Sequence, residues 1–166
     1  MTQIFMALVF SASLVHADGT LTPKAPQWEL TERVWAELSA TNLSILNSYY
    51  DENAVFEDPL TRVQGLAEIT NYYKGLYANV KAIRFEFTDK NLSDDQQFFA
   101  WTMHLTAPGL NGGKEFSVKG SSLIKFSPKS GKVIYHRDYF DTGEFIYENV
   151  PGLKWLHGYI KKSLKK

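Results

Sequence analysis

The spacing of apolar residues changes once along this chain, and this change restricts the fold more than any other feature of the sequence. Before residue 80, apolar residues recur at helical spacing over 28–47 and again over 65–77. After residue 80, apolar and polar residues alternate, as in the segment 99–105. We therefore predict an α+β fold, in which N-terminal helices pack on one face of a curved, mostly antiparallel sheet.

The individual elements follow from local composition. One or two helices are expected over 28–47, with Tyr49 and Tyr50 finishing the second before a turn over 51–53. A short strand over 54–57 then ends at Pro59, because proline cannot donate to a strand ladder. Further strands are expected over 83–87, 99–105, 116–126 and 132–140, the last three forming a meander.

The N-terminus has the composition of a candidate signal peptide over residues 1–17. An apolar run over 4–15 precedes small residues that a signal peptidase reads, although the first three residues carry no positive charge. The mature protein is periplasmic or secreted if this segment is cleaved, and otherwise cytoplasmic with an N-terminal extension. Prolines at 23 and 26 mark residues 18–27 as a linker, which leaves 28–145 as a single domain.

Residues 146–166 are predicted to form a basic amphipathic helix. Apolar residues alternate there with five lysines, and no acidic residue follows Glu148. One interpretation is that the apolar face docks on the sheet or on a second subunit. The other is a weak contact with an anionic membrane surface, to which basic amphipathic helices bind.

Charge and residue types argue against several classes of partner. The chain has 18 basic and 18 acidic residues, so its net charge gives no reason to expect nucleic acid. Without cysteine it can form neither a disulfide nor a thiolate nucleophile. The four histidines lack paired metal-binding spacing, and no glycine-rich nucleotide motif occurs, so we predict neither metal nor cofactor.

Two segments carry the candidate chemistry. Asp58 lies on a turn before Pro59, while the late strand places His136, Asp138 and Phe140 on one face. A carboxylate near an apolar cavity and a His/Asp pair can divide acid and base roles. Two structural alternatives remain: Asp58 caps its turn, and the His/Asp pair only stiffens the core.

The order of these motifs resembles the nuclear transport factor 2-like (NTF2-like) superfamily, and within it the SnoaL-like and ketosteroid-isomerase-like bacterial proteins. The resemblance covers about residues 28–140. It rests on the helix ending before Ala54, the 56–59 turn, Gly65 opening the next helix, and the closing strand. It implies a cone with an internal apolar cavity, and a homodimer formed through the outer sheet face, where residues such as Arg137 would lie.

The resemblance also implies roles for single residues. Asp58 falls on the position of the general base in ketosteroid isomerases, and Tyr50 and Tyr73 on tyrosines that support the oxyanion hole. Val34 stands where the donor tyrosine belongs, and Ser122 where the isomerase has a protonated aspartic acid. Because losing one such donor costs about 100- to 1,000-fold in rate, steroid isomerase activity is not expected.

We therefore predict a pocket for a small hydrophobic ligand. The function expected is that of a cofactor-independent isomerase, cyclase or hydratase, with Asp58, His136 and Asp138 as catalytic residues. The alternative is a non-catalytic ligand-binding or protein-interaction module, and a closed aromatic core would also fit the composition. The residues expected to contact the ligand are Tyr50, Tyr73, Trp101, Met103, Ser122 and Phe140.

Overall fold

The computed structural model of the protein describes residues 25–147, 149–150 and 153–164. The candidate signal peptide and most of the predicted linker lie outside this part of the chain. The first helix begins at Ala25, so Pro26 lies in its first turn rather than in a linker; a proline is tolerated there because the first amide groups of a helix have no intrahelical acceptor. The helices before the sheet are α1 (Ala25–Glu37), η1 (Leu43–Ile45), α2 (Leu46–Tyr49) and α3 (Leu66–Tyr77).

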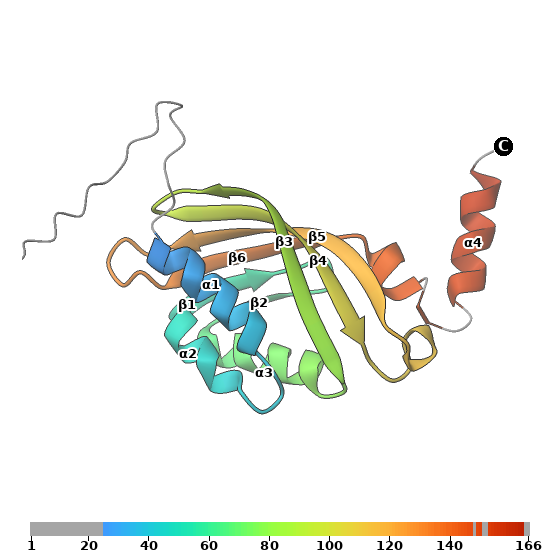
Figure 1. Ribbon diagram of the computed structural model, residues 1–166, viewed down its shortest axis with the longest axis horizontal. Helices are drawn as coiled ribbons and strands as arrows, with labels where there is room; N and C mark the ends of the chain where they lie inside the picture. Colours follow the sequence, from blue (N-terminus) through green and yellow to red (C-terminus); the bar gives the residue numbers. More distant parts are fainter. Residues whose placement is uncertain (1–24, 148, 151–152, 165–166) are drawn as a thin grey trace, which may run out of the picture.

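Six strands form one sheet in the order β2-β1-β6-β5-β4-β3. Strands β1 and β6 are parallel, and every other neighbouring pair is antiparallel. The sheet curves around the helices (Figure 1), so the predicted α+β fold with a curved, mostly antiparallel sheet is confirmed. The strands are β1 (Tyr50–Glu57), β2 (Arg62–Gln64), β3 (Ala82–Leu92), β4 (Gln96–Thr106), β5 (Phe116–Phe126) and β6 (Val133–Phe140).

The predicted turn over 51–53 is wrong, because these residues belong to β1. Tyr50 pairs with Val133 at one end of the parallel contact between β1 and β6, and the register shifts before Val55. Residues 51–53 lie within this irregularity and have no partner in the ladder with β6. The backbone N–H of Asn53 bonds Oδ1 of Asp51 at 3.2 Å, a local contact of the kind that polar turn residues form. The short strand β2, which pairs with β1, was not predicted at all.

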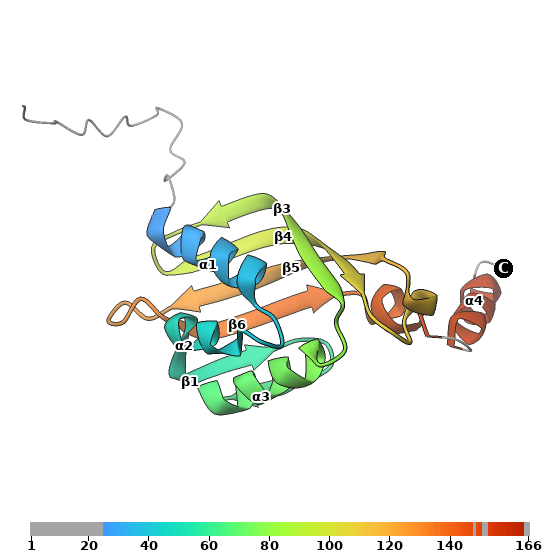
Figure 2. The same ribbon diagram turned by 60° about the horizontal axis from the view of Figure 1, so that its bottom comes forward.

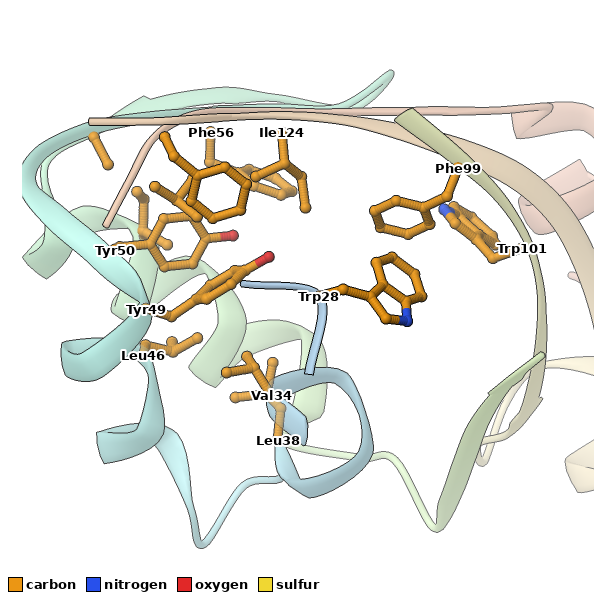
Figure 3. Packing of buried hydrophobic residues seen from close by; sticks show 14 of the residues in the cluster. Trp28, Val34, Leu38, Leu46, Tyr49, Tyr50, Phe56, Phe99, Trp101 and Ile124 are labelled. Atoms are coloured by element: carbon orange, nitrogen blue, oxygen red, sulfur yellow. The ribbon is translucent and has the colours of Figure 1, made fainter. Parts of the chain in front are cut away.

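The core lies between the helices and the concave face of the sheet. The ring of Trp28, from α1, packs edge-on against Phe99 of β4 with 5.0 Å between ring centroids (Figure 3). Leu46 and Tyr49 of α2 are fully buried on the same side. These contacts fix α1 and α2 over the sheet and leave room between them and the strands.

After β6 the chain forms a five-residue π-helix, η3 (Gly143–Tyr147), and then α4 (Leu153–Ser163). A C-terminal helix is thus present, but it begins at Leu153 rather than at residue 146. Of the predicted partners for its apolar face, the sheet is wrong, and a second subunit stays a prediction. Figures 1 and 2 show α4 projecting beyond the end of the sheet, and its Trp155 side chain is 76% exposed. No helix in the described part of the chain is long and apolar enough to cross a membrane.

Candidate functional site

The two segments that carry the predicted chemistry are neighbours in the sheet. Phe56 of β1 pairs with His136 of β6 in the parallel ladder. Asp58 follows the end of β1, and Asp138 lies two residues beyond His136 on β6. Because the strands run in the same direction, both carboxylates lie toward the same end of the sheet.

A cavity of about 130 Å³ lies between the helices and the sheet. Its walls are mostly aliphatic and aromatic, and the only charged residues among them are Asp58 and Asp138. The lining residues Leu60 and Leu76 are also exposed at the surface, so the cavity reaches solvent. Of the residues predicted to contact a ligand, the walls contain Tyr50, Tyr73, Trp101, Met103 and Phe140.

His136 and Ser122 are predicted site residues that do not line the cavity. Both are fully buried behind its wall. They reach the cavity through Asp138, whose Oδ1 lies 2.9 Å from Nε2 of His136 and 2.5 Å from the hydroxyl of Ser122. His136 and Ser122 therefore contact the Asp138 carboxylate from behind the cavity wall and do not face the cavity themselves.

The other ring nitrogen of His136 faces the hydroxyl of Tyr50. The distance between Nδ1 and the Tyr50 oxygen is 2.5 Å. Burial raises the pKa of Tyr50 well above its ordinary value, so the phenol stays protonated and can donate. In the neutral imidazole, Nδ1 then accepts from Tyr50 and Nε2–H donates to the Asp138 carboxylate.

Tyr73 extends this chain of hydrogen bonds. Its hydroxyl lies 3.4 Å from that of Tyr50, and burial likewise raises its pKa. Since Tyr50 has one proton and donates it to His136, Tyr73 is the donor in the contact between the two tyrosines. A chain of hydrogen bonds thus runs from Tyr73 through Tyr50 and His136 to Asp138.

Asp138 has one carboxylate oxygen that is engaged and one that is free. Oδ1 accepts the two hydrogen bonds described above, whereas Oδ2 has no hydrogen-bond partner among the described residues. Ser122 is held in turn by Trp101, whose Nε1 donates to its hydroxyl at 2.9 Å. The side chain of Asp138 is 14% exposed, and the residue belongs to the cavity wall.

Both oxygens of the Asp58 carboxylate accept hydrogen bonds. Oδ1 accepts the backbone N–H groups of Leu60 and Thr61 at 2.7 and 2.8 Å, and Oδ2 accepts the hydroxyl of Tyr72 at 2.5 Å. The capping interpretation of Asp58 is therefore confirmed, although the residue also lines the cavity. Capping and lining are compatible because the turn lies at the cavity edge.

Sequence reasoning missed several residues of the site. Tyr72 belongs to α3, and its contact with Asp58 depends on the geometry of the turn after β1. Tyr49 and Thr31 form a second buried network with Gln97, in which the hydroxyl of Thr31 donates to the Gln97 side chain at 2.9 Å. These partners are far apart in the sequence, so no local pattern indicates them.

The opposite face of β6 carries no part of the cavity. Arg137 forms an ion pair with Glu57 at 3.4 Å, and the Tyr135 hydroxyl donates to the same carboxylate at 3.2 Å. Both charged side chains are partly exposed, so this pair contributes little to stability. Among the described residues, no three side chains of His, Cys, Asp or Glu gather in an arrangement that could hold a metal ion.

Comparison with known sequences identifies one family. The sequence profile of the SnoaL-like domain matches residues 31–136. No curated protein matches the sequence. The matched region includes part of α1, all of α2 and α3, and β6 as far as His136. The lining residues Asp138, Phe140 and Phe145 lie beyond its end.

Solved structures share the fold at low sequence identity. A candidate SnoaL-like polyketide cyclase from Shewanella denitrificans is 19% identical, with a TM-score of 0.64 and coverage of 74% of this chain and 95% of the other. A Catenulispora acidiphila protein with a ketosteroid isomerase-like fold, in complex with trimethylamine, is 14% identical, with a TM-score of 0.65 and coverage of 81% and 98%. An LEH-like epoxide hydrolase from M. tuberculosis is 14% identical, with a TM-score of 0.60 and coverage of 75% and 85%. These likenesses establish the NTF2-like cone.

Proposed function

Because the chain belongs to the SnoaL-like domain family, we propose that its cavity binds a small hydrophobic carbonyl or epoxide compound and catalyses cofactor-independent proton transfer on it. The observation that carries this proposal is the Asp138 carboxylate. It lines a mostly apolar cavity, is held by His136 and Ser122, and keeps one oxygen without a partner among the described residues. A base must offer such a lone pair to the proton it removes.

Asp138 is a better candidate for the base than Asp58. The Asp58 carboxylate accepts three hydrogen bonds, two of which hold its turn. Its Oδ2 keeps one lone pair beside the hydrogen bond from Tyr72, so a proton added there would share that oxygen with Tyr72. Transfer to Oδ2 of Asp138 leaves both of its existing hydrogen bonds intact, so His136 can hold the carboxyl group before and after transfer.

Tyr73 is the proposed acid or oxygen-binding group. Its contact with Tyr50 is 3.4 Å, long for an O–H···O hydrogen bond, so its one hydroxyl proton can turn from Tyr50 to a ligand oxygen. It lines the cavity, keeps its proton because its pKa is raised, and is linked to Asp138 through Tyr50 and His136. A phenol in an apolar cavity can stabilise the charge that develops on a ligand oxygen. Val34 lines the same cavity and supplies no such donor.

Deuterium exchange tests the reaction directly. Wild-type protein is incubated in D₂O with hydrophobic ketones, and with hydrophobic epoxides in a parallel hydrolysis assay, and products are followed by mass spectrometry. The variants are Asp138→Asn and Asp58→Asn, with Glu57→Gln as the matched control on the outer face. We expect Asp138→Asn to lose at least about 100-fold in rate, Asp58→Asn to lose less, and Glu57→Gln to match wild type.

A wild-type rate in Asp138→Asn would reject Asp138 as the base. A wild-type rate in that variant together with a large loss in Asp58→Asn would return the role to Asp58. The replaced oxyanion donors favour a second candidate function, which is ligand binding without chemistry. Saturable binding of the same compounds, with neither exchange nor hydrolysis in the wild type or in any of the three variants, would establish ligand binding without chemistry.

A further inference from the structure

The C-terminal helix α4 exposes large apolar side chains to solvent. Trp155 is 76% exposed and Tyr159 64% exposed, and their rings stack on each other with centroids 6.1 Å apart. Ile160 and Leu164 are 48% and 81% exposed. The helix stands clear of the sheet in both views (Figures 1 and 2), so within the described chain this apolar surface has no cover.

These side chains share one side of the helix. Trp155 and Tyr159 are four residues apart, and so are Ile160 and Leu164, which puts each pair on one stripe. Helical geometry continues through Leu164, whose backbone N–H bonds the carbonyl of Ile160 at 3.1 Å. At about 100° of rotation per residue, the two stripes lie within one half of the circumference. Gly158 and Lys162, also four apart, lie on the other half.

Charge along the chain is divided between this segment and the domain. Residues 149–166 contain five lysines and no acidic residue, and the rest of the sequence contains 13 basic and 18 acidic residues. The segment is therefore cationic on a domain that is net anionic. A negatively charged surface would attract α4 and repel the rest of the domain. The protein would therefore approach such a surface with α4 in front.

We propose that α4 binds anionic lipid surfaces, lying in the interfacial plane with Trp155, Tyr159, Ile160 and Leu164 toward the acyl chains. Tryptophan and tyrosine favour the boundary between headgroups and acyl chains, and lysines beside an apolar face bind anionic headgroups. The 11 residues of α4 span about 16 Å, which is too short to cross a bilayer and suits a helix that lies flat. The proposal does not depend on what the cavity binds.

Vesicle binding by the full chain tests the lipid partner. The probes are vesicles of phosphatidylcholine alone and vesicles that also contain phosphatidylglycerol, separated by sedimentation. We expect binding to the anionic vesicles only, weakened by added salt because the surface potential is screened. In Lys161→Gln/Lys162→Gln the partition coefficient should fall on the order of tenfold or more. Lys119→Gln/Lys129→Gln, which removes one exposed lysine on β5 and one in the turn between β5 and β6, should bind as wild type.

A second measurement tests how the helix lies. Since the chain has no cysteine, Ser163→Cys and Gly158→Cys each give a unique site for an environment-sensitive dye. Ser163 continues the stripe of Trp155 and Tyr159, and Gly158 lies on the lysine side. With anionic vesicles, the dye at 163 should shift to the blue and escape an aqueous quencher, while the dye at 158 stays quenchable.

Three results would overturn the proposal. The first is equal binding to neutral and anionic vesicles. The second is vesicle binding that survives Trp155→Ser/Tyr159→Ser, because another segment would then be responsible. The third is no vesicle binding together with a concentration-dependent dimer that this double variant abolishes, which would make a second copy of the chain the partner of α4.

Discussion

The hydroxyl of Tyr50, at the start of β1, lies 2.5 Å from Nδ1 of His136 in the middle of β6. The contact joins two residues 86 positions apart and sets the proton on the other ring nitrogen, which faces Asp138. Tyr50 thus positions a group that positions the candidate base.

The tautomer of His136 should be visible by NMR. We expect ¹⁵N-edited spectra to show Nε2 protonated and Nδ1 unprotonated in the neutral ring. Tyr50→Phe removes the donor to a buried nitrogen and should lower the free energy of unfolding by about 1–3 kcal/mol. Tyr159→Phe, at an exposed phenol, is the control and should change neither measurement. A neutral ring protonated at Nδ1 would contradict the assignment.

Gly120 should not tolerate a side chain. It pairs with Trp101 across β4 and β5, and a Cβ there would lie 2.3 Å from the indole ring and 2.7 Å from the backbone oxygen of Tyr139. Gly120→Ala should therefore cost about 1–3 kcal/mol in denaturant unfolding, or more. Gly75→Ala is the matched control, because nothing lies within 4 Å and the site is helical, so it should stabilise by up to about 1 kcal/mol. Equal effects of the two substitutions would refute this packing.

Ser122 and Trp101 should be energetically coupled. Ser122→Ala leaves Nε1 of Trp101 without its buried acceptor and should cost about 1–3 kcal/mol of unfolding free energy. In a Trp101→Phe background the same substitution should cost about 1 kcal/mol less, because that unpaired donor is gone. Strict additivity of the two substitutions in urea unfolding would show that the hydrogen bond contributes nothing.

Asp58 should show a structural role that is separable from catalysis. Asp58→Ala removes the acceptor for three donors and should destabilise the protein by about 1–3 kcal/mol. In Asp58→Asn, the amide oxygen can still accept the turn N–H groups, so the change should stay within about 1 kcal/mol. Asp94→Ala, at an exposed carboxylate, should be neutral. Thermal unfolding ranks the three variants, and equal loss in the alanine and asparagine variants would rule out the cap.

Stability should decline in alkaline solution. Burial raises the pKa of Tyr49, Tyr50 and Tyr73 in the folded protein above the ordinary value of 10. The contribution of these protonated phenols to stability is fully present below pH ~10. It is lost as the pH rises above ~10, because the phenols then ionise in the unfolded chain but not in the folded protein. Above pH ~10, each of these three tyrosines should lower the free energy of unfolding by up to about 1.4 kcal/mol for every unit by which the pH rises.

Urea unfolding between about pH 9 and 11.5, with tyrosinate absorbance recorded in parallel, checks this dependence. The exposed Tyr159 serves as the reference through Tyr159→Phe, which should not alter the slope. A free energy of unfolding that stays constant across this range would show that the buried phenols ionise in the folded protein.

Local sequence pattern predicted most of the secondary structure. The strand over 116–126 and the helix that follows Gly65 were placed correctly because period and turn residues agree there. The pattern failed at 51–53, where three polar residues favour a turn but the chain stays extended through the register shift between β1 and β6. It also failed to predict that α4 would stand off the sheet, since an amphipathic pattern shows that a face is apolar and not what covers it.

The sequence by itself determined the α+β class, the family resemblance and the shared face of His136, Asp138 and Phe140. Only the tertiary structure decided how these groups are arranged. Both oxygens of Asp58 accept hydrogen bonds, Oδ2 of Asp138 has no hydrogen-bond partner among the described residues, and His136 is buried between Tyr50 and Asp138. The physical reason is that strand periodicity fixes the direction of a side chain. Its hydrogen-bond partners come from distant segments, and folding alone brings those together.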